Sequence, residues 1–509
     1  MQDFRSCLES DCSTLSGFMA NKLDSLDHLS SWHSDWTQLS VVVVGLAKTG
    51  FSVADTLHEL GAKVLVVADS ASAEILDIVE VLGIPSIIGK LAEQQTAIEE
   101  FKPDLIVVSP GVAPTNALVQ SAVEKKIPIW GDLDLAWRLR DRFDVKQEWI
   151  CVTGTNGKTT VVELTEAMLL ASGVRAVACG NIGKPILDCI RDPAEFEVLV
   201  VEVSSFQLHY MNHIEPFSAT CLNIAEDHLD WHGSFEAYRL SKERIYQGTK
   251  VACIYNLEDA ATEQMVQAAT VLDGARAIGF GLGTPKPSNV GYVDEFLVDR
   301  AFLDQRADSA LEIASLEDFH GLGVLTPHLL SNIAAATALA RSFGVPPAAC
   351  REALRNFRVS SHRIELVLEH GGVRYINDSK ATNAHAATAS LSSFESVVWI
   401  LGGQLKGVDI SGLIAKFAKR LRSAVVIGLN RKEILEHFAK LAPAVSVVEV
   451  GDGENVMERA VEIASSNAVS GDVVLLAPAA ASMDQFESYQ DRGMKFKEAV
   501  VKLFGGSNA

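Results

Sequence analysis

Trp149-Ile150-Cys151-Val152-Thr153-Gly154-Thr155-Asn156-Gly157-Lys158-Thr159-Thr160 is an apolar run that passes into a glycine-rich turn and then into Lys-Thr-Thr. A buried strand that leads through such a turn into a helix presents unpaired N–H groups and the positive end of the helix dipole to an anion. We therefore predict an ATP-binding phosphate loop, with Lys158 at the β- and γ-phosphates and the Thr159 hydroxyl on Mg²⁺. The predicted ATP-binding residues of the loop are Gly154, Thr155, Asn156, Gly157, Lys158, Thr159 and Thr160.

The spacing of this loop differs from the general phosphate-loop pattern, G-x-x-x-x-G-K-[ST]. Gly154 lies closer to Gly157 than the pattern requires, and Val152 occupies the place of the leading glycine. The physical requirements are still met, because a strand, a glycine-rich turn and a helix start follow one another. A glycine turn before an ordinary helix is the competing interpretation, and the Lys-Thr-Thr sequence argues against it.

Two further side chains stand at or just beyond the ends of neighbouring strand-like runs. Glu202 follows Val198–Val201, and His228 comes soon after Ala219–Ile224. Because the carboxyl ends of parallel strands meet at one edge of a sheet, we expect both side chains beside the phosphate loop. Either residue alone would more often be solvated or structural. Together, at adjacent strand ends beside a phosphate loop, they favour metal coordination.

The alternation of strands and helices extends in both directions, which predicts α/β units with parallel sheets and helices on both faces. The expected strands outside the central block are Val41–Val44, Lys63–Ala68, Leu105–Val108, Val373–Ile376, Val397–Leu401, Val425–Gly428 and Val473–Ala477. We expect a helix at Ser331–Ala340 and a surface loop at 281–290. We predict three domains, 40–131, 132–359 and 360–509, after an extension, 1–39, that is flexible or caps the first domain.

Composition limits the classes of partner. The 509-residue chain carries 44 basic and 65 acidic residues, a net charge of −21, which argues against nucleic acid or an anionic membrane as the main partner. The eight cysteines show no C-x-x-C spacing, so we expect buried thiols rather than disulfides or a zinc site. No run approaches the ~20 apolar residues needed to cross a bilayer, and the N-terminus lacks a secretory pattern. These features predict a cytoplasmic protein without membrane insertion.

Motifs beyond the phosphate loop narrow the interpretation. They are Gly180-Asn181-Ile182-Gly183, Glu202-Val203-Ser204-Ser205-Phe206-Gln207-Leu208, Asn223-Ile224-Ala225-Glu226-Asp227-His228-Leu229-Asp230, His362-Arg363, Asn377-Asp378-Ser379-Lys380-Ala381-Thr382-Asn383, Leu401-Gly402-Gly403, Ala477-Pro478-Ala479-Ala480-Ala481-Ser482-Met483-Asp484-Gln485-Phe486 and Arg492-Gly493. Over about residues 40 to 505, their order resembles that of the Mur ligase family, in particular its D-glutamate-adding members. The shortened loop is shared by the Mur ligases and the folylpolyglutamate synthetases.

The resemblance implies a fold and a reaction. The fold would comprise an N-terminal Rossmann-like domain for a uridine nucleotide, a central P-loop-type ATPase domain with a parallel sheet, and a C-terminal Rossmann-like domain. The enzyme would be an ATP-dependent amide-forming ligase of peptidoglycan synthesis, with UDP-N-acetylmuramoyl-L-alanine, D-glutamate, ATP and two Mg²⁺ ions as ligands. ATP would activate the terminal carboxylate as an acyl phosphate, which the amine of D-glutamate then attacks. We also expect the chain to act as a monomer.

The resemblance assigns residue roles by position. The catalytic residues are Lys158, Glu202, His228 and Lys242, and the metal ligands are Thr159, Glu202, His228 and a carbamylated Lys242. The remaining nucleotide contacts are Asn332, Arg363 and Asp378. The UDP-substrate residues are Lys48, Thr49, Asp69, Ser70, Gly111 and Asn181, and the D-glutamate residues are Lys380, Thr382, Lys406, Ser482, Met483 and Tyr489. Without the resemblance, Lys242 would be taken for a solvated helix charge.

Two positions depart from the family pattern, and three alternatives remain open. His328-Leu329 stands where the family often has a His-Asn pair, and Tyr489 stands where a Phe is familiar. The alternatives are another glutamate-adding ligase of the folylpolyglutamate synthetase type, a P-loop NTPase and a Rossmann oxidoreductase. Folylpolyglutamate synthetases lack an N-terminal uridine-nucleotide domain, so the first block of this chain argues against them. A P-loop NTPase would need the full spacing of the phosphate loop. The third needs a dinucleotide fingerprint, but Gly45-x-x-x-x-Gly50 has Ala47 in place of its middle glycine.

Overall fold

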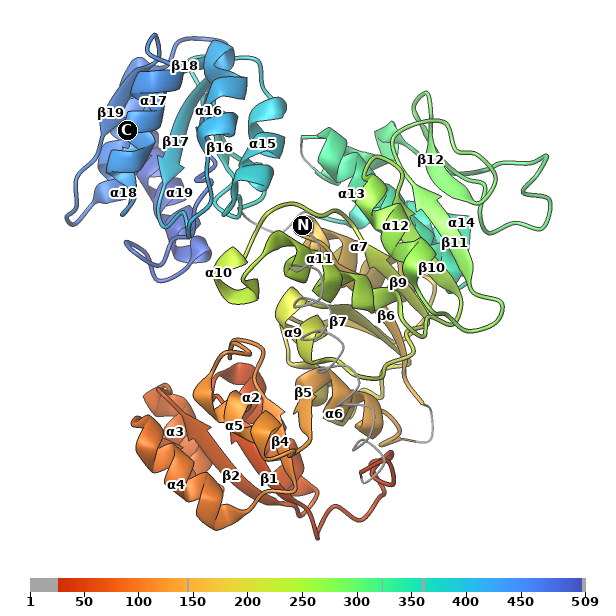
Figure 1. Cartoon of the computed structure of the whole chain (residues 1–509). Coiled ribbons are helices and arrows are strands. Elements are labelled where there is room, and N and C mark those ends of the chain that lie inside the picture. Colours follow the sequence, from red (N-terminus) through yellow and green to blue (C-terminus); the bar gives the residue numbers. More distant parts are fainter. Residues whose placement is uncertain (1–25, 144–145, 323, 359–361, 506–509) are drawn as a thin grey trace, which may run out of the picture.

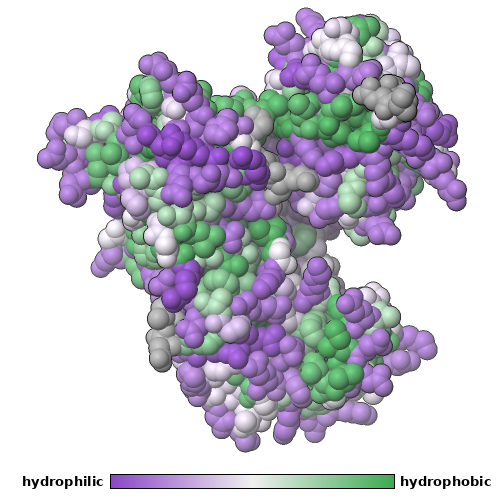
Figure 2. All heavy atoms as spheres, turned by 180° about the vertical axis from the view of Figure 1, so that it is seen from behind, coloured by the Kyte–Doolittle hydropathy of each residue, from purple (hydrophilic) through white to green (hydrophobic). Residues whose placement is uncertain are grey.

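Three α/β domains, each built on its own sheet, make up the chain in the computed structural model (Figure 1). The structure describes residues 26–143, 146–322, 324–358 and 362–505. The N-terminal and C-terminal domains each contact the central domain, and Figure 2 shows an indentation between these two outer domains on a largely hydrophilic surface. The predicted three-domain α/β architecture is confirmed.

The N-terminal domain is a five-stranded parallel sheet in the order β3-β2-β1-β4-β5. The strand order reverses between β1 and β4, and ligands of open α/β sheets bind in the crevice at such a switch point. Its strands are β1 (Ser40–Val44), β2 (Lys63–Ala68), β3 (Ser86–Ile88), β4 (Leu105–Val108) and β5 (Ile129–Gly131). Its helices are α2 (Lys48–Glu59), α3 (Ala73–Val81), α4 (Leu91–Phe101) and α5 (Ala117–Glu124).

The segment before β1 packs against the junction between the N-terminal and central domains. Trp36 is buried in the same apolar cluster as β1, and the Trp32 N–H donates to Asp141 Oδ1 at 2.8 Å. The Arg142 guanidinium lies 4.3 Å from the centre of the Trp32 ring. Residues 26–39 therefore form a strap across the start of the central domain. The remainder of the predicted extension, residues 1–25, lies outside the described residues.

The central domain has a nine-stranded sheet in the order β14-β13-β12-β11-β10-β9-β6-β8-β7. The strands from β7 to β12 are parallel, whereas β13 and β14 are antiparallel additions at one edge. The strands are β6 (Glu148–Thr153), β7 (Ala176–Gly180), β8 (Val198–Glu202), β9 (Ser218–Cys221), β10 (Ala252–Asn256), β11 (Arg276–Phe280), β12 (Asn289–Val293), β13 (Phe296–Asp299) and β14 (Leu311–Ser315).

Two expectations about this sheet need correction. The expected strand Ala219–Ile224 ends at Cys221, because the backbone beyond it turns toward the phosphate loop and Asn223 O accepts from Thr155 N at 3.0 Å. The expected surface loop at 281–290 runs into β12 at Asn289, because that segment pairs with β13 in a hairpin. In both places tertiary pairing decides where the strand begins or ends.

Helices cover the central sheet and position its edge residues. The helices are α6 (Asp132–Leu139), α7 (Lys158–Ala171), α8 (Ile186–Arg191), α9 (Ser205–Tyr210), α10 (Leu229–His232), α11 (Phe235–Glu243), α12 (Ala260–Ala268), α13 (Pro327–Ser342) and α14 (Pro347–Asn356). The expected helix Ser331–Ala340 lies within α13, which Thr326 caps and whose alanine-rich face is buried against α7. Small side chains on α13 allow close helix packing behind the phosphate loop.

The C-terminal domain is a six-stranded sheet in the order β15-β16-β20-β17-β18-β19, parallel except for β15. The strands are β15 (Glu365–His370), β16 (Val373–Asn377), β17 (Val397–Gly402), β18 (Leu421–Ile427), β19 (Ser446–Glu449) and β20 (Val473–Leu476). The helices are α15 (Ala384–Ser392), α16 (Ser411–Phe417), α17 (Arg431–Leu441), α18 (Val456–Asn467) and α19 (Tyr489–Gly505).

A buried apolar cluster joins the first two domains, but the C-terminal domain has separate clusters. One buried cluster runs from β1 of the first domain through α6 to β6 and β8 of the central domain, whereas the C-terminal domain has two clusters of its own. The six cysteines among the described residues are free and buried. Within the same residues, no single helix is long and apolar enough to cross a membrane. The pair Leu316–Leu322 and Pro327–Ser342 passes only jointly, bent by 105°.

Candidate functional site

The phosphate loop follows β6 and leads into α7, as predicted. Gly154 and Gly157 have positive φ angles, 148° and 87°, which L residues with a side chain rarely adopt. A Cβ at Gly157 would lie 2.5 Å from Asn332 Oδ1, so only a glycine lets α13 approach the loop this closely. Lys158 is the first residue of α7, and its Nζ donates to the carbonyls of Gly154 at 2.8 Å and Thr155 at 2.9 Å.

A buried carboxylate lies beside the first turn of α7. Glu202, at the end of β8, is 3% exposed, and its Oε2 accepts from Thr159 Oγ1 at 2.7 Å. Its Oε1 accepts from Asn181 Nδ2 at 2.9 Å. A carboxylate next to a hydroxyl at a phosphate loop is the oxygen-donor chemistry that Mg²⁺ prefers. The residues present therefore fit the predicted metal, and the structure brings Thr159 and Glu202 together.

Lys242 on α11 points into the same region from below the loop. The side chain is 2% exposed, and its Nζ donates to Gly154 O at 3.0 Å and Thr153 Oγ1 at 3.2 Å. Burial, and secondarily the nearby Lys158, lowers the pKa of the Lys242 amine to about 7. The interpretation of Lys242 as a solvated helix charge is therefore wrong.

His228 stands just before α10, with a left-handed backbone φ of 53°. Its ring lies edge-on to Phe206, 4.8 Å between centroids, and its Nε2 is 3.8 Å from Asp227 Oδ2. Burial lowers the pKa of His228, which favours a neutral ring with a free lone pair. Among the described residues, no group of three or more His, Cys, Asp and Glu side chains is arranged to hold a metal ion, so the metal assignment of His228 stays a prediction.

The C-terminal domain completes one cavity of about 310 Å³ over the loop. Arg363, Asp378, Lys380 and Thr382 line it opposite the phosphate loop, with Asn332 from α13. Burial raises the pKa of Asp378 to about 6 although Ser390 Oγ donates to it, and burial together with Arg363 lowers the pKa of Lys380 to about 8. All residues predicted to contact ATP therefore line this cavity, except Gly154, which forms the turn beneath it.

A second cavity of about 670 Å³ lies at the switch point of the N-terminal sheet. Its lining includes every predicted UDP-substrate residue, namely Lys48, Thr49, Asp69, Ser70, Gly111 and Asn181. Asn181 also lines the cavity over the phosphate loop, so one side chain borders both. A ligand that fills the N-terminal cavity and extends past Asn181 reaches the phosphate loop.

Comparison with known protein families accounts for all three domains. Residues 39–131 match the Mur ligase MurD-like N-terminal domain, residues 152–340 the Mur ligase middle domain, and residues 362–480 the Mur ligase, glutamate ligase domain. The chain belongs to the Mur ligase family.

Curated relatives of this Mur ligase are similar over nearly their whole lengths. The UDP-N-acetylmuramoylalanine–D-glutamate ligase of Leifsonia xyli is 52% identical over 497 residues, covering 95% of this chain and 96% of the relative. The proteins of the same name from Streptomyces avermitilis and Mycobacterium bovis are 48% and 41% identical, covering 92% and 90% of this chain and 99% and 95% of the relatives.

Solved structures of Mur-type ligases share the fold. The UDP-N-acetylmuramate–alanine ligase of Thermotoga maritima aligns with a TM-score of 0.54 at 20% identity, covering 92% of this chain and 100% of that structure. A pseudomurein peptide ligase from Methanothermus fervidus gives the same score at 17% identity, with coverage of 92% and 100%. The family matches and the curated relatives exclude the P-loop NTPase and Rossmann oxidoreductase interpretations.

Four of the six residues predicted to bind D-glutamate lie outside both cavities. Among the described residues, Lys406, Ser482, Met483 and Tyr489 line neither cavity, and Met483 is 75% exposed. They lie on two loops of the C-terminal domain that pair through Gln404 N and Ala481 O at 2.9 Å, and at the start of α19. The Lys380 ammonium lies 4.0 Å from the centre of the Tyr489 ring, which links this set to the cavity.

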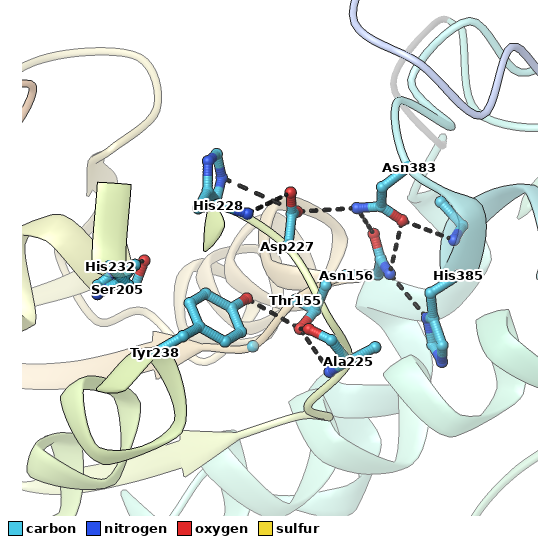
Figure 3. A network of polar contacts seen from close by, with 12 residues as sticks. Thr155, Asn156, Ser205, Ala225, Asp227, His228, His232, Tyr238, Asn383 and His385 are labelled. Carbon is cyan, nitrogen blue, oxygen red and sulfur yellow. Dashed lines mark hydrogen bonds and ion pairs between the residues drawn. The ribbon is translucent and has the colours of Figure 1, made fainter. Parts of the chain in front are cut away.

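Four polar residues of the site carried no role in the sequence analysis: Asn223, Asp227, Asn383 and His385. Asn223 pairs with the backbone of Asn156 on both sides, through Oδ1 at 2.9 Å and Nδ2 at 3.0 Å. Asn383 and His385, from the C-terminal domain, contact the Asn156 side chain, as Figure 3 shows. Asn223, Asp227 and Asn383 stood within recognised motifs, but spacing along the chain does not reveal contacts between distant segments or between domains.

Proposed function

We propose that this Mur ligase joins D-glutamate to UDP-N-acetylmuramoyl-L-alanine in an ATP-driven step of peptidoglycan synthesis. The names of relatives at 41–52% identity support this substrate pair. The observation that carries the proposal is Asn181, which borders both the N-terminal cavity and the phosphate-loop cavity. A UDP group held at the N-terminal sheet would extend its acyl end past Asn181 toward the γ-phosphate of ATP.

Activation of the carboxylate is mainly a matter of position and charge. A carboxylate is a poor electrophile, and phosphorylation of one oxygen converts it into an acyl phosphate with phosphate as the leaving group. Lys158 and the N–H groups at the start of α7 would bind the transferring phosphoryl group. Lys380 and Arg363, from the C-terminal side of the cavity, would add positive charge opposite the loop.

Two Mg²⁺ ions would be held by residues of the central domain. Thr159 and Glu202 would hold one, and His228 with a carbamylated Lys242 the other. The ions would neutralise the charge that develops on the phosphate oxygens. The contact between Thr159 and Glu202 at 2.7 Å supports the first set, and the neutral ring favoured at His228 supports the second.

The proposed carbamate has a physical basis in the buried amine. Only the neutral amine attacks carbon dioxide: R–NH2 + CO2 gives R–NH–COO⁻ + H⁺. With a pKa of about 7, Lys242 is substantially neutral at physiological pH. Once formed, the carbamate would place an anion beside Lys158 and a metal ion, and this would offset the cost of burying a charge.

D-Glutamate would bind on the C-terminal domain. Lys380 and Lys406 would pair with its two carboxylates, and Ser482, Thr382 and nearby backbone donors would fix their orientation. Tyr489 would form an aromatic wall, with Met483 at the rim. Arg492 supports these loops, because its buried guanidinium donates to Ser379 O at 2.9 Å and to Ala480 O at 3.2 Å.

The proposal needs a single copy of the chain, because residues of one chain line both cavities. We therefore propose that the enzyme acts as a monomer. Specific activity should not change over a hundredfold dilution, and sedimentation should give a mass near 54.8 kDa. Activity that collapses on dilution would contradict the monomer without contradicting the reaction.

Phosphate release from ATP tests the reaction directly. We expect release only when UDP-N-acetylmuramoyl-L-alanine and D-glutamate are both present, with one phosphate per amide formed. Thr159→Val should abolish release but leave binding of the UDP substrate unchanged, because the N-terminal cavity does not include Thr159. Release supported by L-glutamate and a folate instead would identify a folylpolyglutamate synthetase-like enzyme and refute the proposal.

A further inference from the structure

The side-chain amide of Asn383, in the C-terminal domain, both caps a helix and contacts the central domain. It caps α15, where its Oδ1 accepts from Ala386 N at 2.9 Å, and the same Oδ1 also accepts from Asn156 Nδ2 at 3.5 Å. Its Nδ2 points to the central domain and donates to Asp227 Oδ2 at 3.0 Å and to Asn156 Oδ1 at 3.3 Å (Figure 3). The residue is 7% exposed, so water competes poorly for these bonds.

The two acceptors of Asn383 lead into different parts of the central site. Asn156 belongs to the phosphate loop, and its backbone is already paired with Asn223. Asp227 precedes the predicted metal ligand His228, and its Oδ1 accepts from the His228 N–H at 3.0 Å. One side chain from the C-terminal domain therefore bonds to the phosphate loop and to the turn that carries His228.

We propose that Asn383 is a positioning residue that couples docking of the C-terminal domain to the conformation of the phosphate loop and the His228 turn. The C-terminal domain also supplies Arg363, Asp378 and Lys380 to the nucleotide cavity, so a nucleotide contacts both domains. By linkage, a bond that stabilises the docked arrangement strengthens nucleotide binding, and bound nucleotide strengthens docking by the same factor. The coupling rests on the proposed function only for its effect on turnover, because nucleotide binding reports it separately.

The donor nitrogen of the Asn383 amide can be replaced while its capping oxygen is kept. Asn383→Asp keeps the capping oxygen, since Asp caps helices as well as Asn does, but turns the donor into a carboxylate oxygen facing Asp227. Asn383→Ser also keeps a cap but is too short to reach the central domain. A residue that only caps α15 would tolerate both changes.

The measurements are the affinity for a non-hydrolysable ATP analogue by calorimetry and the radius of gyration by small-angle scattering, with and without the analogue. We expect Asn383→Ser to weaken binding about threefold and Asn383→Asp at least tenfold, about 1.4 kcal/mol. Asn383→Asp should also leave the protein more extended at saturating analogue. KM for ATP should rise in the same order as the loss of affinity.

Exchanging the two side chains tests whether the contact between Asn383 and Asp227 carries the effect. In Asp227→Asn the new amide can donate to the carboxylate that Asn383→Asp introduces, in place of the lost bond. Asn383→Asp added to that background should therefore change affinity less than threefold. Ser392→Ala, at the far end of α15, is the matched control and should bind the analogue normally. Normal binding by Asn383→Asp, or an equal loss in both backgrounds, would overturn the proposal. UDP binding to the N-terminal cavity verifies that each variant is folded.

Discussion

Lys242 offers the most quantitative test of the proposed metal site. Its amine is buried beneath the phosphate loop, and its pKa is lowered from 10.5 to about 7. At pH 7 about half of such an amine is neutral, compared with roughly one part in three thousand for an unperturbed lysine. The fraction able to react with carbon dioxide is thus about a thousandfold larger than for a surface lysine. Carbamate formation at this position is therefore predicted at ambient carbon dioxide.

The perturbations are Lys242→Ala, Lys242→Arg and removal of carbon dioxide. We expect Lys242→Ala to lower turnover at least ~100-fold, as loss of a metal-holding group does, and to recover partly with acetate or formate. Lys242→Arg should be equally inactive, because a guanidinium forms no carbamate under these conditions. The wild-type enzyme should lose activity when bicarbonate is removed, most strongly below pH 7, where the amine is protonated. ¹³C-bicarbonate should give a carbamate resonance that is absent from Lys242→Ala.

Lys250 provides the matched control for these measurements. It is a partly exposed lysine paired with Glu148 at 2.8 Å, and Lys250→Ala should keep both the activity and the carbamate resonance. If Lys242 serves instead as a cation for phosphate, Lys242→Arg will keep much of the activity and bicarbonate will have no effect. That outcome, or full activity of Lys242→Ala, would refute the reasoning.

Three further variants test other parts of the structure. Gly157→Ala forces a side chain into a left-handed backbone and against Asn332, at about 1–2 kcal/mol, so ATP-analogue affinity should fall about tenfold by calorimetry while UDP affinity stays unchanged. Asp132→Asn removes a carboxyl whose pKa is raised to about 6 by burial. Between pH 4 and 6 this carboxyl is protonated in the native wild type but mostly ionised in the unfolded chain, so the wild type loses stability as pH rises. The stability of Asp132→Asn relative to wild type should therefore increase by about 2 kcal/mol between pH 4 and 7 in urea unfolding, and a pH-independent difference would contradict this. Arg492→Leu leaves Ser379 O without its buried donor and should cost about 3 kcal/mol or more, with a larger rise in KM for D-glutamate than for ATP; a loss below about 1 kcal/mol would count against it.

Much of the fold follows from local patterns. The apolar runs that end at Val44, Val108 and Val201 are parallel strands buried on both faces, and such strands appear in a sequence as continuous β-branched segments. The glycines around Lys158 mark a turn whose backbone angles only glycine adopts readily. These features depend on neighbouring residues, so the sequence alone predicts them.

Pairing between distant segments is not predictable in this way. The antiparallel strands β13 and β14 are short; β13 pairs with β12 and β14 with β13, and both pairings depend on a sheet edge that other strands create. The end of β9 at Cys221 depends on Asn223 meeting the phosphate loop. The burial of Lys242 is likewise set by how α11 packs against α9 and directs this side chain to the end of β6, and a helical lysine gives no local sign of it.

Long-range contacts also hold the shortened phosphate loop in place. Val152 stays in β6, so the turn from Gly154 to Gly157 is compact, and Asn156 is its only long side chain. That side chain is held by His385 Nδ1 at 2.8 Å and by Asn383, both from the C-terminal domain, while Asn223 holds its backbone from within the central domain. Besides the bonds from Lys158 to the loop carbonyls, side chains from two domains thus shape this loop. Its ability to bind ATP should therefore depend on domain docking to a degree that an isolated P-loop domain does not show, and Asn383→Asp measures that dependence.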